Sequence, residues 1–113
     1  MFNVLFMSVG RRVELLEAFR NAYRKLGLDG CIVGVDVDPL APALQVVDKP
    51  YRVPPLSCST FEPLLIQLCQ REQINLVFPL IDPDVPVLAR SRKEIEKTGA
   101  RVAAVSTQAA SLT

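Results

Sequence analysis

Gly10, Arg11 and Arg12 are the first residues in this sequence whose types and spacing suit chemistry. They follow directly after a short apolar run, residues 2–8, and a helical pattern begins just beyond them. A helix that follows a strand offers free backbone N–H groups and a positive dipole end, which attract anions. Two guanidinium groups add bidentate binding of a carboxylate or a phosphate. These three residues are therefore a candidate anion site.

A solvated basic turn is the competing interpretation of the two arginines. In that case their side chains pair with Glu14 or Glu17 on the predicted helix and contribute little. Cations at a helix N-terminus are mildly unfavourable for stability. Because the two arginines do not stabilise the helix there, their position slightly favours a binding role. From the residues alone, both interpretations stay open.

Four aspartates that follow two further apolar runs form a second candidate group: Asp36, Asp38, Asp82 and Asp84. In open α/β sheets, ligands bind at the edge where the strands end, and carboxylates there can hold Mg²⁺ or orient an amine. Helix capping is the competing role, and we expect it for Asp38 and for one of Asp82 and Asp84. Asp36 has no capping role in the sequence and is the better functional candidate.

Several familiar sites are excluded or weakened by what the sequence lacks. A dinucleotide fingerprint needs three glycines as G-x-G-x-x-G, and only Gly10 is present, so binding of NAD or FAD is a weak alternative. The glycine-lysine-serine/threonine step of a P-loop occurs nowhere. The chain has no histidine, which removes triad hydrolysis. We predict neither a catalytic residue nor a metal ligand within it.

Composition excludes several kinds of partner. Thirteen basic and twelve acidic residues give a net charge of +1, which is no electrostatic basis for binding nucleic acid or a membrane surface. No apolar stretch approaches the roughly 18 residues that span a bilayer, so we expect a cytoplasmic protein. The cysteines are widely spaced and suit neither a zinc site nor a disulfide framework. We expect three free, partly buried thiols: Cys31, Cys58 and Cys69.

The 113 residues fit one domain, and half of them are apolar. Unbroken apolar runs predict strands that are covered on both faces, at residues 2–8, 31–37, 76–81 and 102–105. Helical periodicity fills the intervals at residues 13–26, 61–69 and 85–95, and a proline-flanked edge strand is expected at residues 51–53. This alternation predicts an α/β fold with a Rossmann-like parallel sheet of about five strands in the order 3-2-1-4-5.

Capping residues mark the expected ends of the helices. Gly27 and Gly30 end the first helix, whose apolar stripe runs to Leu26, while Thr60 is the N-cap of the second. Gly99 closes the third helix. A further helix is expected to begin near residue 107.

Five segments in this order resemble the N-terminal, or pre-ATP-grasp, domain of ATP-grasp ligases, in the branch related to the large subunit of carbamoyl-phosphate synthase. The resemblance covers residues 3–112, essentially the whole chain. The segments are NVLFMSVGRRVELLEAF, GVDVDPLAPAL, VDKPYRVPPL, NLVFPLIDPDVPVLA and GARVAAVSTQAASL.

The resemblance implies a reaction in which ATP phosphorylates a carboxylate, after which an amine displaces phosphate from the acyl phosphate. In such enzymes later subdomains hold ATP and Mg²⁺, and this sequence does not contain them. The resemblance therefore implies a domain, residues 1–113, that binds no cofactor alone and is inactive without an ATP-grasp core in cis or in trans. It also implies a pocket for a small carboxylate or amine substrate, bordered by Gly10, Arg11, Arg12, Glu14, Asp36 and Asp82.

One alternative remains from the residues themselves: a free-standing Rossmann-like module that binds a small anion or a protein partner without chemistry. For the ligase domain, the apolar face that meets the rest of the enzyme would be exposed in isolation. We therefore expect self-association into a homo-oligomer.

Overall fold

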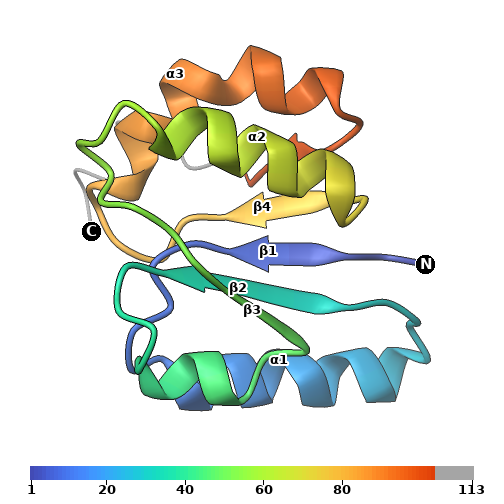
Figure 1. The fold of residues 1–113 in the computed structure, drawn as a ribbon. Coiled ribbons are helices and arrows are strands. Elements are labelled where there is room, and N and C mark those ends of the chain that lie inside the picture. The colour runs from blue at the N-terminus through green and yellow to red at the C-terminus, as the bar shows by residue number, and fades with distance from the viewer. Residues whose placement is uncertain (104–113) are drawn as a thin grey trace.

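Strands and helices alternate along the chain in the computed structural model, which describes residues 1–103 (Figure 1). The strands are β1 (Val4–Phe6), β2 (Ile32–Asp36), β3 (Lys49–Arg52), β4 (Leu76–Phe78) and β5 (Arg101–Val102). The helices are α1 (Val13–Leu26), α2 (Phe61–Arg71), α3 (Asp84–Lys97) and the short 3-10 helix η1 (Pro42–Gln45). The strands form one parallel sheet in the order β3-β2-β1-β4-β5, which confirms the predicted fold class and strand order.

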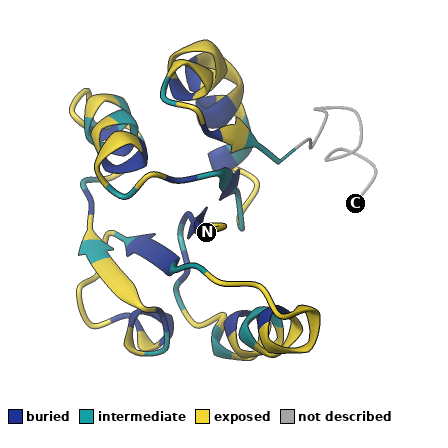
Figure 2. Ribbon diagram, turned by 90° about the vertical axis from the view of Figure 1, so that its right-hand side faces the viewer, coloured by how far each residue is buried: buried dark blue, intermediate teal, exposed yellow. Residues whose placement is uncertain are grey.

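Helices cover both faces of the sheet, with α2 and α3 on one face and α1 with η1 on the other (Figure 1). Side chains alternate along β1, so Leu5 packs toward α2 and α3 while Val4 and Phe6 pack toward α1. The Phe6 ring stacks on Phe78 at a centroid distance of 5.1 Å and meets the edge of Phe19 at 5.0 Å. The buried residues thus lie between the layers (Figure 2), as expected for strands that are apolar at every position.

Three strands end earlier than the apolar runs that predicted them, β2 by one residue and β1 and β4 by more, and the edge strand predicted at residues 51–53 is Lys49–Arg52. The chain leaves β1 through Ser8 and Gly10, whose φ angles of +50° and +49° are incompatible with a strand. β4 ends at Phe78, because Pro79 cannot donate to a strand ladder. Residues 79–81 are apolar but belong to the loop that leads into α3, so the strand predicted there is wrong at its end.

The predicted helix ends are confirmed at one glycine and need correction at another. Gly27 is the left-handed C-cap of α1, with φ +66°. Gly30 has a different role: a Cβ at this position would lie 1.9 Å from the Phe2 carbonyl oxygen, so glycine is needed for close approach of two backbones. Thr60 occupies the N-cap position of α2, although its side chain makes no capping bond. Gly99 lies just beyond the end of α3, with φ +99°.

The buried faces of two helices differ from the predicted stripes. Leu26 is 72% exposed at the end of α1, where the sheet no longer covers the helix. On α3, the three- and four-residue spacing that predicts the helix includes Arg92, which is exposed. The buried face of α3 is formed by Asp84, Val87, Leu88, Ser91 and Ile95.

Among residues 1–103, no helix combines the length and the apolar character that crossing a membrane requires. The helix expected near residue 107, and residues 104–105 of the last predicted strand, lie outside the described residues.

Candidate functional site

The loops that follow β1, β2 and β4 meet at one edge of the sheet, which we call the carboxyl rim: residues 7–12, 37–41 and 79–83. Backbone bonds hold the rim together, including one of 3.2 Å from the Val9 N–H to the Val35 carbonyl. All six residues predicted to border a substrate pocket lie on this rim or directly beside it. The topology places them there because every strand in a parallel sheet ends at the same edge.

Asp36 joins the first two loops of the rim. Its Oδ2 accepts a 2.8 Å hydrogen bond from the Gly10 N–H, and its Oδ1 accepts one of 2.9 Å from the Asp38 N–H. Asp36 caps no helix, but these two bonds give it a structural role that the sequence did not indicate. The sequence shows helix caps, but it does not show a bond between loops that are 26 residues apart. The helix cap expected at Asp38 is wrong, because Ala41 is the N-cap of η1. Asp38 instead accepts a bond from the Leu40 N–H and closes a turn before η1.

Asp84 joins the loops after β1 and β4 from inside the protein. Its carboxylate is completely buried. Oδ1 accepts a 2.8 Å bond from the Ser8 hydroxyl, and Oδ2 accepts bonds from the N–H groups of Leu80 at 3.0 Å and Ile81 at 3.2 Å. The helix-capping role expected for one of Asp82 and Asp84 is therefore wrong, because Pro83 is the N-cap of α3 and makes no side-chain capping bond. Asp84 instead binds the loop before the helix, and Asp82 is exposed.

The two arginines of the rim have different surroundings, although both are exposed. Arg12 occupies the N-cap position of α1 and donates a 3.2 Å bond to the Leu80 carbonyl. Arg11 forms no hydrogen bond or ion pair through its side chain with any of residues 1–103, and neither arginine pairs with Glu14 or Glu17 in this range. Arg11 is therefore a solvated cation on a fixed loop.

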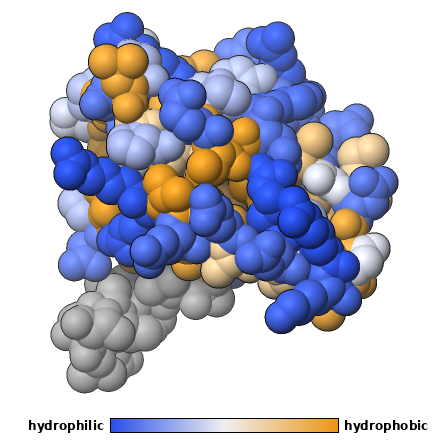
Figure 3. Space-filling view, turned by 90° about the horizontal axis from the view of Figure 1, so that it is seen from below, coloured by the Kyte–Doolittle hydropathy of each residue, from blue (hydrophilic) through white to orange (hydrophobic). Residues whose placement is uncertain are grey.

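An open hollow of about 510 Å³ lies beside the start of α1. It brings together three of the six predicted site residues, together with two apolar neighbours. Its lining is Arg11, Arg12, Val13, Glu14 and Leu15. Asp36 reaches the site through its bond to Gly10, and Asp82 does not line the hollow. From the α1 side, the molecule is largely hydrophilic, with hydrophobic groups set among the charged ones (Figure 3).

The donor set of the rim suits an anion and does not suit a metal ion. Within the described part of the chain, no group of three or more histidine, cysteine, aspartate or glutamate side chains is placed to hold a metal. Both carboxylate oxygens of Asp36 and of Asp84 already accept bonds from the protein. These residues therefore do not fit Mg²⁺, and we derive no step through a metal or a nucleotide on them.

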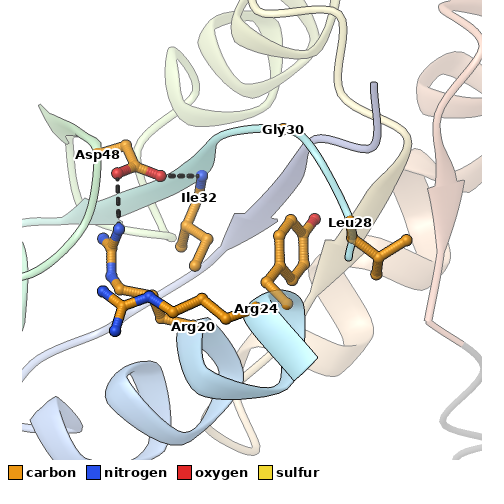
Figure 4. A pocket seen from close by; sticks show the side chains of 7 residues that line it. Arg20, Arg24, Leu28, Gly30, Ile32 and Asp48 are labelled. Atoms are coloured by element: carbon orange, nitrogen blue, oxygen red, sulfur yellow. Dashed lines mark hydrogen bonds and ion pairs between the residues drawn. The ribbon is translucent and has the colours of Figure 1, made fainter. Parts of the chain in front are cut away.

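The opposite edge of the sheet, where the strands begin, we call the amino edge. A pocket of about 160 Å³ lies there between α1 and the starts of β2 and β3, and Arg20, Arg24 and Asp48 line it (Figure 4). Arg20 pairs with Asp48 at 2.9 Å and also donates to a backbone carbonyl. The other Asp48 oxygen accepts the Ile32 N–H at 2.8 Å. The charges of Arg20 and Asp48 therefore serve the fold.

Glu72 fastens the edge strand β3 to the end of α2. Only 8% of its side chain is exposed, and it accepts 2.8 Å and 2.5 Å bonds from Lys49 and Tyr51. The hydrogen bond from Lys49 has the larger effect in lowering the pKa of Glu72, and the bond from Tyr51 has the next largest. The same two bonds raise the pKa of Lys49 and of Tyr51. Residues 48–51, Asp-Lys-Pro-Tyr, thus supply hydrogen bonds and an ion pair that stabilise the amino edge.

Asn3 is a structural residue that the sequence reasoning missed. It is 6% exposed, at the start of β1. Its Nδ2 donates to the carbonyls of Glu72 and Gln73, and its Oδ1 accepts the Cys31 N–H at 2.8 Å. One polar residue inside an apolar run was the available signal, because a buried amide needs several fixed partners.

The three cysteines are free thiols, as expected. Burial raises the pKa of Cys69 to about 12, whereas a hydrogen bond with the Thr60 hydroxyl lowers that of Cys58. None of the three lies beside the hollow of the rim.

Comparison with known proteins identifies the domain type. Residues 4–103 match the family model described as "PylC-like, N-terminal domain". A search of curated proteins gave no match. Among solved structures, the chain is similar to the biotin carboxylase subunit of pyruvate carboxylase, with a TM-score of 0.58 and 21% sequence identity. The match covers 90% of this chain and 22% of that one, and at this identity it shows the fold alone.

Proposed function

The chain belongs to the family of PylC-like N-terminal domains, and from that premise we propose that it is the substrate-side domain of a cytoplasmic carboxylate–amine ligase. The family match agrees with the resemblance to the N-terminal domain of ATP-grasp enzymes. The finer assignment, to the carbamoyl-phosphate synthase-like branch with an acyl-phosphate intermediate, is part of the proposal. On this account the domain is inactive alone, and an ATP-grasp core supplies ATP and Mg²⁺.

The observation that carries the proposal is the Arg11 guanidinium. It lies on a loop that is fixed on both sides, yet it has no partner among residues 1–103. A guanidinium in this position binds a carboxylate, or the acyl phosphate formed from it, through paired charge-assisted hydrogen bonds. Glu14, on the same hollow, is placed to attract the ammonium form of an amine.

Exposed apolar side chains of the rim support a contact with the ATP-grasp core. Leu40 is 81% exposed, Val37 is 46% exposed and Ile81 is 39% exposed. All three follow strands at the edge that carries the hollow. We therefore propose that the core covers this edge, and that the isolated chain self-associates through it. Sedimentation that shows a monomer at high concentration would count against the self-association.

The test is an ADP-release assay on the complete protein that the gene encodes, with panels of carboxylates and amines. We expect ADP release to require a carboxylate, and Arg11→Ala to raise the KM for that carboxylate about tenfold, since it removes a charge-assisted bond. Arg24→Ala, an exposed arginine at the far end of α1, is the matched control and should leave KM unchanged. An unchanged KM in Arg11→Ala, or the absence of an ATP-grasp core from both this reading frame and its neighbours, would contradict the proposal.

A further inference from the structure

Ser8 holds a backbone conformation that is unusual for a residue with a side chain. Its φ is +50°, in the left-handed region that glycine adopts readily and other residues avoid. Gly10, two residues later, is also left-handed, with φ +49°. A non-glycine residue stays in this region only where its surroundings hold it there. One restraint on Ser8 is the 2.8 Å bond from its hydroxyl to Asp84. Its neighbours are held by backbone bonds, from the Met7 N–H to Phe78 and from the Val9 N–H to Val35.

The same buried carboxylate also controls the neighbouring loop. Asp84 is 0% exposed and forms no ion pair with any of residues 1–103, so the hydrogen-bond donors around it must compensate for its burial. Besides Ser8, those donors are the N–H groups of Leu80 and Ile81. Leu80, so fixed, presents its carbonyl to the guanidinium of Arg12 at 3.2 Å.

These contacts close a ring around the loop after β1. Ser8 and Arg12 are four residues apart, and both are attached to the loop after β4, one through Asp84 and the other through Leu80. Between them, Gly10 is attached to Asp36 on the opposite side. The backbone on either side of Arg11 is therefore held, while the Arg11 side chain forms no hydrogen bond or ion pair with the described residues 1–103.

We propose that Ser8 and Asp84 are positioning residues for Arg11, and that Arg11, rather than Arg12, makes the main contact with the anionic group of the substrate. This inference rests on the proposed function and assigns separate roles within the same site. A preorganised loop binds more tightly because its ordering cost is met before the ligand arrives. Removing the restraint should therefore weaken binding even in chains that remain folded.

The experiment is calorimetric titration of the 113-residue chain with phosphonoacetate, a stable molecule that carries both a carboxylate and a phosphonate, at constant ionic strength. The free energy of unfolding of each variant is measured in parallel. Arg11→Ala should raise Kd about tenfold without loss of stability. Ser8→Ala and Asp84→Asn should each raise Kd about threefold in the fully folded chain. If Asp84→Asn does not fold, the Kd of Ser8→Ala alone tests the positioning role.

Asn3→Ala is the matched control, because Asn3 is also buried and polar but lies at the amino edge. It should lower stability and leave Kd unchanged, which separates positioning from general destabilisation. An unchanged Kd in Ser8→Ala, beside a raised Kd in Arg11→Ala, would overturn this inference and leave the proposed function standing. Absence of binding by the unsubstituted chain, or an unchanged Kd in Arg11→Ala, would overturn both.

Discussion

Polar side chains hold the strand ends together at both edges of the sheet, but the residues that do so differ between the two edges. At the amino edge, Asn3 ties the strand starts together, and Arg20 and Lys49 are paired with Asp48 and Glu72. At the carboxyl rim, Asp36 and Asp84 bind backbone N–H and hydroxyl groups, so their negative charges hold the loops without consuming an arginine. Arg11 therefore remains on the rim without a hydrogen bond or ion pair to any of residues 1–103. The difference separates charge used for folding from charge available to a ligand.

Gly30→Ala should have the largest effect on stability, and it tests the amino edge. The added Cβ would lie 1.9 Å from a backbone oxygen of Phe2, so one of the two segments must move. We expect a loss of about 3 kcal/mol or more in the free energy of unfolding. Gly27→Ala is the control, with a positive φ but nothing within 4 Å of the new Cβ, and should cost about 1 kcal/mol. Equal losses in urea unfolding would contradict the account.

Asn3→Ala should rank second, because it removes a buried amide and the partner of three backbone groups, at Cys31, Glu72 and Gln73. We expect a loss of about 2–3 kcal/mol. At the rim, Asp36→Ala frees the N–H groups of Gly10 and Asp38 in a half-exposed loop that water can reach. Its cost should be about 1 kcal/mol. Urea unfolding of both variants would show the reverse order if the rim, not the amino edge, carried more of the stability.

Glu72→Gln should reveal the amino edge through pH. The folded pKa of Glu72 lies below its ordinary value of 4.5, so its contribution is complete above that pH and is lost as pH falls through the folded value. Lys49 has a folded pKa above 10.5, so its contribution is lost as pH rises through that value. The stability difference between the unsubstituted chain and Glu72→Gln should therefore be greatest near neutral pH and shrink at both extremes. A difference that stays constant from pH 3 to pH 8 would contradict this.

The smallest expected difference in stability is between Arg20→Ala and Arg11→Ala. Arg20→Ala removes bonds to Asp48 and to a backbone carbonyl, both in the amino-edge pocket, and should cost about 1 kcal/mol. Arg11→Ala removes no contact within residues 1–103 and should change stability by less than about 0.5 kcal/mol. Thermal unfolding of the pair measures the difference. A larger loss for Arg11→Ala would mean that this side chain serves the fold.

The sequence predicted the fold well, because its strands are apolar on both faces and its helices begin and end at recognisable signals. The apolar residues of β1 and the left-handed Gly27 are examples. The predictions were wrong where an apolar residue is not packed against the sheet, or where it does not take part in the hydrogen bonds between strands. Leu26 lies beyond the covered part of α1, and Pro79 ends β4 although the apolar run continues.

The site was predictable only in part. Parallel topology brings Gly10, Arg11 and Asp36 to one edge, and strand order alone makes that clear. The bonds that fix this edge join residues far apart in the sequence, 76 positions apart for Ser8 and Asp84. No local pattern shows such a bond. The unusual φ of Ser8 and the complete burial of Asp84 become visible only in the folded chain.

The central claim is that the rim, and not the amino edge, meets an anionic substrate. An amide chemical-shift map of the chain titrated with phosphonoacetate tests it most directly, because both edges report in one experiment. The account predicts saturable shifts at residues 10–15 and at Asp36, with little change at Arg20, Arg24 and Asp48. Shifts confined to the amino-edge pocket, with residues 10–15 unmoved, would contradict it.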